Sequence, residues 1–371
     1  MKRLESRVFA RAAVLLLVAG MSVCAGAGYT RAQNSRASDL QYFRIGTGPT
    51  TGIYFPVGAL IASMVSNPPG SRPCDRGGSC GVPNLIAVAQ ATQDSVERLQ
   101  GIADRRLDSG LVQADVAHLA FNGEGPFAGK PLRNLRAIAA LYTEYLHVVV
   151  RTGAGIRSFT DLKGKRVGLD LDGSGTRLMV QLVFPHLGIP PRDLKIETLG
   201  VTQAGDQLRA RRLDTFAFTS GIPAEPIQRL TDDTSIGLLP VPARIRERVA
   251  SSGTGIFAAE IPAGTYTGIP ATPTLGTRAL WVVPAETDPK LVYELTRALW
   301  HPNNQRLLAS GPAAARAMRV QDATADLTIP LHPGAARYYR EAGYAVPSVA
   351  DTPGPARRVP PPPPRKPPAR G

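Results

Sequence analysis

The amino-acid sequence predicts a two-lobed α/β fold with a binding cleft between the lobes. Apolar segments typical of strands alternate with segments of helical periodicity along most of the chain. A chain of 371 residues is long enough for two domains, each with its own core. Small polar residues follow predicted strands at four turns, two in each half of the chain. In α/β folds such turns bind ligands, so we expect the two sets to face each other.

The first of these turns, residues 46–53, separates a predicted strand at residues 42–45 from a predicted helix at residues 54–65. Free N–H groups at a helix N-terminus, beside glycines and hydroxyls, are suited to an anionic or polar ligand. The alternative is a tight turn that only needs glycine, with hydroxyls that cap the helix. The candidate ligand-binding residues here are Thr47, Gly48, Thr50, Thr51, Gly52 and Tyr54.

The rest of the first half continues the alternation, with strands at residues 85–91 and 109–112 and helices at 94–103 and 114–121. Gln113 and Asp115 follow the second of these strands, where they could hold a ligand amine or simply cap the next helix. Two further strands, at residues 135–141 and 147–151, are expected to meet around Tyr142 and Glu144, near a hinge. Tyr142 could cover the ligand or pack in the core.

The second half repeats the pattern and implies parallel sheets covered by helices. Strands are predicted at residues 166–169, 194–199, 215–219, 236–241 and 274–283, and helices at 177–187, 204–212, 223–230, 244–250, 291–299, 304–308 and 335–341. The turn with Ser174, Gly175 and Thr176 mirrors the first turn, and the alternative role of its hydroxyls is again helix capping. Thr219 and Ser220 end a strand, where we expect them to line the cleft.

The two ends of the chain differ from its body. Residues 1–11 are basic and residues 12–23 are apolar, a pattern typical of a secretory signal peptide, so we predict export to the periplasm with a signal peptide at residues 1–32 and a mature chain that starts near Gly28 or Gln33. Lipid anchoring at Cys24 is disfavoured, because Met21 to Val23 fit the small-residue requirement poorly. Residues 351–371 are basic and rich in proline, which predicts an exposed polyproline-II segment, either a solvated appendage or a recognition element.

Charge and cysteine usage narrow the function further. Of the net charge of +14, the two ends carry four units each, and the body has no basic run interleaved with aromatic residues. We therefore expect no nucleic-acid partner. Cys74 and Cys80 lie in a loop rich in glycine and proline, and in an oxidising compartment such a pair favours a disulfide over a metal site, which would need more ligands.

Sequence signatures of catalysis are absent from the chain. It contains neither a Gly-x-Ser-x-Gly elbow, nor a His-x-x-x-His pair, nor a P-loop lysine. Gly46, Gly48 and Gly52 miss the dinucleotide-binding spacing by one residue. We therefore predict a binding protein rather than an enzyme, with no cofactor and no metal.

Several stretches of residues 42–344, in collinear order, resemble the TAXI family. Its members are the extracytoplasmic solute receptors of one class of tripartite ATP-independent periplasmic (TRAP) transporters. The matching stretches include residues 46–56, 95–99, 110–117, 141–147, 161–167, 173–176, 261–266 and 329–339. The resemblance implies a fold like the type II periplasmic binding proteins, with two α/β lobes joined by hinge strands around a central cleft.

The resemblance also implies a function and a site. The solute would be a small organic acid or amino acid, such as glutamate or 2-oxoglutarate, and the partners would be the membrane subunits of a TRAP permease. It adds Ser95, at the start of a helix, to the candidate site. Arg177 could pair with an acidic solute or point to solvent. We expect a monomer with one lobe at residues 40–145 and 285–345 and the other at residues 146–284, the returning hinge strand included.

Overall fold

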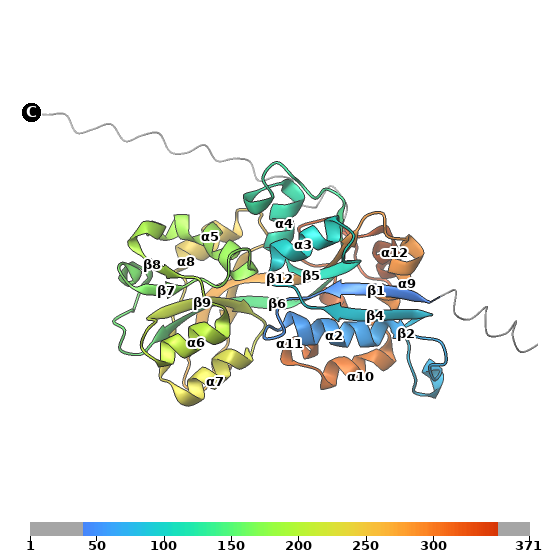
Figure 1. The fold of residues 1–371 in the computed structure, drawn as a ribbon, viewed down its shortest axis with the longest axis horizontal. Helices are drawn as coiled ribbons and strands as arrows, with labels where there is room; N and C mark the ends of the chain where they lie inside the picture. Colours follow the sequence, from blue (N-terminus) through green and yellow to red (C-terminus); the bar gives the residue numbers. More distant parts are fainter. Residues whose placement is uncertain (1–39, 348–371) are drawn as a thin grey trace, which may run out of the picture.

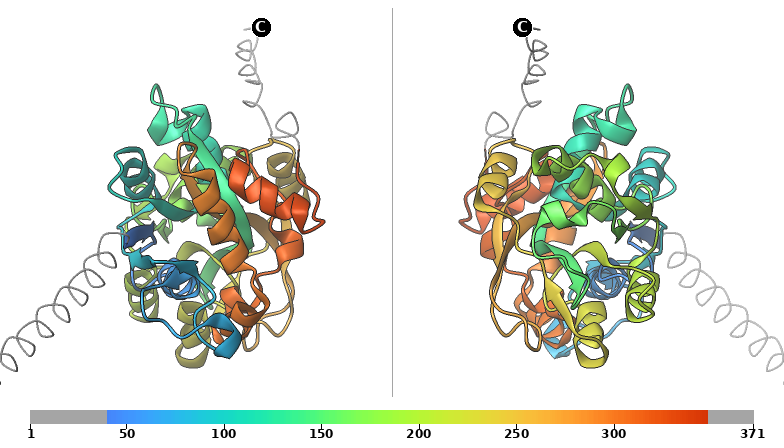
Figure 2. Two further views of the ribbon diagram at one scale, coloured as in Figure 1. Left: turned by 90° about the vertical axis from the view of Figure 1, so that its right-hand side faces the viewer. Right: turned by 90° about the vertical axis from the view of Figure 1, so that its left-hand side faces the viewer.

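The computed structural model describes residues 40–347 of the chain and confirms the predicted α/β fold (Figure 1). One continuous mixed sheet runs through the molecule in the strand order β3-β2-β4-β1-β5-β12-β6-β9-β7-β8. Helices cover both faces of this sheet in each half of the molecule, as the two end views show (Figure 2). The signal peptide, Cys24 and the proline-rich tail predicted from the sequence lie outside the described residues.

The first lobe is built on strands β1 (Gln41–Gly46), β4 (Leu85–Gln90) and β5 (Ser109–Gln113), which are parallel to one another. Two short strands, β2 (Ser66–Asn67) and β3 (Val82–Pro83), extend its edge. Its helices are α2 (Tyr54–Val65), α3 (Ser95–Ala103), α4 (Ala114–Asn122), α9 (Pro289–Leu299), α10 (Pro302–Ser310), α11 (Ala313–Arg316) and α12 (Pro333–Glu341). One apolar cluster includes Ile45, Ile61 and Leu295, and another packs α3 and α4 on the opposite face.

The second lobe is built on the parallel strands β7 (Arg166–Gly168), β8 (Lys195–Glu197) and β9 (Thr215–Ser220). Strands β10 (Ile236–Leu238) and β11 (Phe257–Ile261) are added at the long strands that enter this lobe. Helices α5 (Gly175–Leu187) and α8 (Ala243–Ala250) contribute to one apolar cluster, whereas α6 (Val201–Arg209) and α7 (Glu225–Asp233) contribute to the other.

Two long strands carry the chain between the lobes and correct the prediction of parallel sheets. Residues 135–151 form one strand, β6 (Leu135–Arg151), rather than the two strands predicted, and it pairs with β12 (Thr272–Pro284) in antiparallel orientation. On β6, Leu141 packs in the first lobe and Leu146 in the second, so the strand passes from one core to the other without a loop. Tyr142 and Glu144 therefore lie within this strand, at the crossing.

The limits of the two lobes stay a prediction, because apolar clusters describe packing rather than independently folding units. Strand β11 was missed by the sequence reasoning, because its five residues Phe257–Ile261 end a segment rich in glycine and serine. No helix within residues 40–347 is long and apolar enough to cross a membrane.

Candidate functional site

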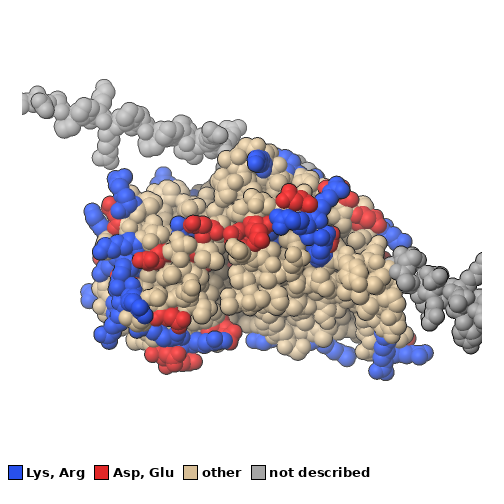
Figure 3. All heavy atoms as spheres, viewed as in Figure 1, with Lys and Arg blue, Asp and Glu red and all other residues tan. Residues whose placement is uncertain are grey.

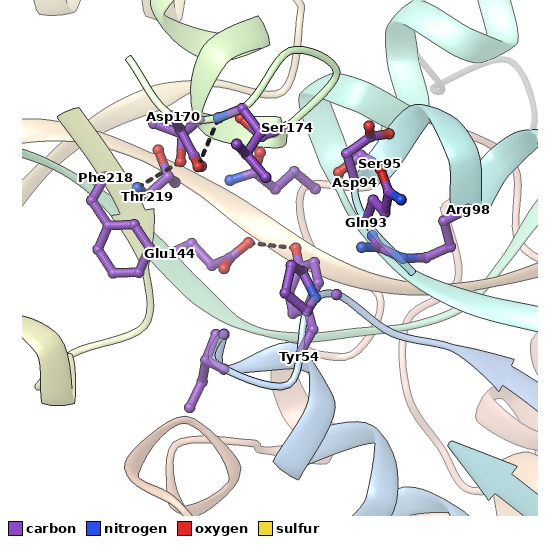
Figure 4. A pocket seen from close by; sticks show the side chains of 18 residues that line it. Tyr54, Gln93, Asp94, Ser95, Arg98, Glu144, Asp170, Ser174, Phe218 and Thr219 are labelled. Carbon is purple, nitrogen blue, oxygen red and sulfur yellow. Dashed lines mark hydrogen bonds between the residues drawn. The ribbon is translucent and has the colours of Figure 1, made fainter. Parts of the chain in front are cut away.

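A cavity of about 110 Å³ lies between the two lobes, at the ends of their strands. The first lobe contributes the turn before α2, the start of α3 and the end of β5, while β6 crosses the floor with Glu144. The second lobe contributes residues 170–176 and the end of β9. Figure 4 shows these side chains converging on one space from both lobes. On the face seen in Figure 3, a group of acidic side chains lies across the boundary between the lobes.

Arg98 is the cation of this cavity, and it comes from the first turn of α3. Its side chain is buried, with 2% of the residue exposed. Its Nε donates to the backbone oxygen of Thr47 (2.9 Å), and its Nη1 donates to the backbone oxygen of Leu111. Across residues 40–347 it forms no ion pair, and Nη2 takes part in no hydrogen bond. Burial lowers the pKa of Arg98, but a guanidinium stays charged in proteins.

The first turn brings backbone donors close to this guanidinium. A Cβ added at Gly48 would lie 3.5 Å from Nη2 of Arg98, so the space between this glycine and the guanidinium is about the width of one carbon atom. Helix α2 begins directly afterwards, with Ile53 at its N-cap, no side-chain cap and no acidic residue in its first turn. The unpaired N–H groups of such a helix end attract an anion. Arg98 and the start of α2 thus form one seat for a negatively charged group.

Tyr54 and Glu144 form a buried pair across the floor of the cavity. The Tyr54 hydroxyl donates to Oε2 of Glu144 (2.6 Å), as Figure 4 shows. Burial raises the pKa of Glu144 to about 8, even though the hydrogen bond from Tyr54 opposes this shift. Near neutral pH the carboxyl group therefore carries a proton and adds no negative charge beside Arg98.

Three more buried polar groups lie beside or beneath this pair. Oε1 of Gln113, Oδ2 of Asp115 and the hydroxyl of Tyr142 are buried and have no hydrogen-bond partner among the described residues. The other oxygen of Asp115 accepts from Thr277 (3.1 Å), and burial raises the pKa of Asp115 to about 7. Gln113 lines the cavity, so a donor on the solute could satisfy its oxygen.

The second lobe presents a turn and a helix start to the same space. Asp170 lines the cavity with a left-handed backbone (φ 62°), and burial raises its pKa. Ser174 caps α5 by accepting from the N–H of Arg177 (3.1 Å). Thr176 accepts from the N–H of Thr219 (3.0 Å), which fixes the end of β9 against the start of α5.

The two lobes touch at the mouth of the cavity. The N–H of Ser95 donates to the backbone oxygen of Gly173 (3.2 Å), which joins α3 to the turn before α5. A Cβ at Gly175 would lie 1.7 Å from Oε1 of Gln113, so only glycine lets this side chain approach the second lobe so closely. Leu178 on α5 packs in an apolar cluster of the first lobe. These contacts therefore join the two lobes beside the space around Arg98.

The structure gathers most of the predicted ligand-binding residues around this cavity. Those that line it are Gly48, Gly52, Tyr54, Ser95, Gln113, Ser174, Gly175, Thr176 and Thr219. Thr50, Thr51 and Ser220 line a neighbouring compartment instead. Thr47, Asp115 and Tyr142 are not among the lining residues of either space. Thr47 acts through its backbone oxygen, which holds Arg98. Whether any of these residues binds a solute stays a prediction.

The sequence reasoning missed the residues with the most distinctive chemistry. Arg98 and Phe218 were not singled out, and Gln93, Asp94 and Asp170 were not assigned to the site. Glu144 was placed near a hinge without a role in binding. Arg177 pairs with Asp172 (3.0 Å) and does not line the cavity. The one available signal for Arg98 was a charged residue within the mostly apolar face of a short helix.

The disulfide between Cys74 and Cys80 is present, as predicted. The fold also brings His301 to it, with Nε2 3.8 Å from Sγ of Cys74. The sequence reasoning judged a metal site short of ligands, and His301 supplies a third group near the two sulfur atoms. The sulfur atoms are bonded to each other and are not thiolates, so this cluster does not offer the ligand set of a metal site.

Comparisons with known proteins found one matching family model and several solved structures that are similar to this chain. The sequence model of the NMT1-like family matches residues 45–343. A protein of Bordetella bronchiseptica RB50 is 15% identical, with a TM-score of 0.48, over 85% of this chain and 93% of that chain. The periplasmic aliphatic sulphonate binding protein of Escherichia coli is 15% identical, with a TM-score of 0.41, over 75% and 81%. A putative L-cystine ABC transporter of Listeria monocytogenes is 14% identical, with a TM-score of 0.45, over 76% and 99%.

Proposed function

Because this chain belongs to the NMT1-like family, we propose that it is an exported solute-binding protein that captures a small organic acid or amino acid between its lobes. The observation that carries the proposal is Arg98. This guanidinium is 98% buried and forms no ion pair in the described part of the chain, although the Asp94 carboxylate acts on it from the cavity wall, so it can take a direct counter-charge. A solute carboxylate would supply it at the seat formed with the start of α2.

The rest of the cavity supports a solute with a second polar group. Among residues 40–347 the oxygen of Gln113 is an acceptor without a partner, while protonated Glu144 can donate a hydrogen bond. Asp94 and Asp170 add carboxylates at the walls, where they favour an ammonium or hydroxyl group of the solute close to them. Closure of the lobes excludes water and strengthens each of these contacts.

The second part of the proposal concerns the membrane protein that receives the solute. Following the resemblance to the TAXI family, we propose that the closed protein delivers its solute to a TRAP permease driven by an ion gradient. A binding protein of an ATP-driven importer or of a sensor kinase would have the same two-lobed architecture. Reconstitution distinguishes a TRAP permease from an ATP-driven importer. With this protein present, purified permease in vesicles should import the solute with an imposed ion gradient and without ATP.

A thermal-shift screen of amino acids, 2-oxo acids and dicarboxylates, followed by calorimetry, tests the binding function. We expect at least one small carboxylate to raise the melting temperature and to bind with one-to-one stoichiometry. Recovery of the solute unchanged after incubation distinguishes binding from catalysis. If no carboxylate binds and neutral or cationic solutes do, the role assigned to Arg98 is wrong.

A further inference from the structure

The cavity around Arg98 is not the only space between the lobes. A second compartment of about 440 Å³ adjoins it, on the side of α6 and α7. Three residues line both spaces: Gly52 and Ile53 from the first lobe, and Phe218 from the second. These residues therefore stand between the smaller cavity around Arg98 and a larger compartment beside it.

Phe218 is positioned to limit the cavity around Arg98 at the end away from the cation. It lies on β9 and is 8% exposed. Figure 4 shows Phe218 beside Glu144, at the opposite end of the cavity from Arg98. Ile53 is half-buried at the N-cap of α2, so the second apolar side chain reaches the boundary from the other lobe. A solute held at Arg98 would extend toward these two side chains.

The compartment behind them is polar and nearly balanced in charge. Arg209 pairs with Asp206 (2.7 Å), and Arg229 pairs with Glu225. The hydroxyl-bearing residues Thr50 and Thr51 line it on the side of the first lobe. Such a lining would accept the polar end of a solute that passed Phe218 and Ile53. The two apolar side chains themselves offer that polar end no hydrogen bond.

We infer that Phe218 and Ile53 form a partition that sets the maximum length of the solute. This inference rests on the proposed function and adds a specificity-determining pair to it. Short acids fit between Arg98 and the partition. Longer acids must displace one of the two side chains, although there is space for their polar ends beyond it.

Two series of acids of increasing length test the partition by calorimetry. One runs through aspartate, glutamate, 2-aminoadipate and 2-aminopimelate, and the other through the corresponding 2-oxo acids. The readout is the ratio of the affinity for the longest acid to that for the tightest-binding shorter acid of the series. In the wild-type protein we expect the affinity for the longest acid to be at least tenfold lower than that for the tightest-binding shorter acid. Phe218→Ala should reduce this drop at least fivefold.

Two further variants make the test specific. Phe216→Ala removes the same side chain two residues earlier on β9, in the core and away from both spaces, and should keep the wild-type ratio. Ile53→Ala opens the partition from the first lobe and replaces Phe218→Ala if that variant does not fold. An unchanged ratio in the opened variant, with short acids still bound, would overturn the partition alone. A wild-type protein that binds no carboxylate would overturn the proposed function and the partition with it.

Discussion

Burial disfavours the charged forms of both Arg98 and Glu144, which share one cavity, but only Glu144 becomes neutral. A guanidinium keeps its charge when it is removed from water, so Arg98 carries a positive charge that forms no ion pair within residues 40–347 into the space between the lobes. A carboxyl group can instead take up a proton, and burial raises the pKa of Glu144 to about 8. The cavity is therefore more positive than its count of acidic and basic residues implies.

Substitution of Arg98 by lysine should weaken binding of the solute without removing the charge. Lysine cannot keep the two backbone hydrogen bonds and still present a planar donor pair to a carboxylate. We expect a loss of ~1.5–3 kcal/mol, or roughly ten- to a hundredfold in affinity, by calorimetry. Arg177→Lys is the matched control, because Arg177 pairs with Asp172 outside the cavity. Equal losses in both variants would contradict the anchoring role of Arg98.

The buried carboxyl groups predict that stability falls as pH rises. The pKa of Glu144 is raised from 4.5 to about 8 and that of Asp115 from 3.8 to about 7, so the folded protein holds protons that the unfolded chain has released. The stability they contribute is complete below about pH 4 and is lost progressively up to about pH 8. The melting temperature of the solute-free protein should therefore fall between these limits.

Glu144→Gln isolates the share of one group in this dependence. The amide cannot ionise, so the fall in melting temperature between pH 5 and pH 8 should become shallower by about 5 °C. The remaining slope belongs mainly to Asp115, and Asp115→Asn should reduce it in turn. If the wild-type melting temperature is flat across this range, the two carboxyl groups are better solvated than their burial indicates.

At the scale of single residues, the sequence predicted the site residues in turns better than the site residues within helices and strands. Glycines and hydroxyls beside helix starts have a local signature, and Gly48, Gly175 and Thr176 could be proposed from it. Arg98 and Phe218 have none, because their importance arises from the space that two distant segments enclose. Only the packing of α3 against β1 and β5 places the Arg98 side chain beside the first turn.

At the scale of elements, the start of α5 shows how a helix of one lobe meets a side chain of the other. Gly175 is the first residue of α5, and Gln113 ends β5. Their contact crosses between the lobes, so it contributes to closure rather than to the core of either lobe. The sequence could predict both elements but not that they meet.

Gly175→Ala should hinder closure while leaving the fold intact. The added Cβ would overlap Oε1 of Gln113, whereas alanine is a better helix former than glycine. We expect an unchanged or slightly higher melting temperature without solute and a loss of affinity of tenfold or more. Gly200→Ala is the control, since a Cβ at that helix N-cap meets nothing within 4 Å. Normal affinity in Gly175→Ala would show that binding does not need this contact.

The largest error at this scale was the division of residues 135–151 into two strands. The polar residues of the stretch 142–145 interrupt an apolar run, and a short polar interruption is a common sign of a turn. In the structure they remain extended because β12 pairs with all four of them, and β9 pairs with the strand on its other side from Tyr145 onward. Tertiary hydrogen bonds thus override the local signal, and no single-sequence pattern reveals them.

At the scale of the whole molecule, two lobes in contact through Ser95, Gln113 and Leu178 predict a change of shape on binding. Without a solute, the charge of Arg98 and the orphan oxygen of Gln113 favour access of water, so we expect the lobes to separate. X-ray scattering should show a smaller radius of gyration after addition of the solute found in the screen. Gly175→Ala should show less compaction, and identical radii in the wild-type protein would contradict closure.

The two strands that join the lobes also determine how such a movement can occur. Strands β6 and β12 are hydrogen-bonded to each other where they cross between the cores, and their register shifts between Ala279 and Leu280. A ribbon of this kind resists bending in its own plane but twists readily. We therefore expect the lobes to rotate relative to each other by twisting β6 and β12. These strands should resist the twist elastically and return when the solute leaves. Within residues 40–347 both crossings lie inside these strands, so the strands themselves must absorb the rotation, and we expect the solute to enter from the side opposite them.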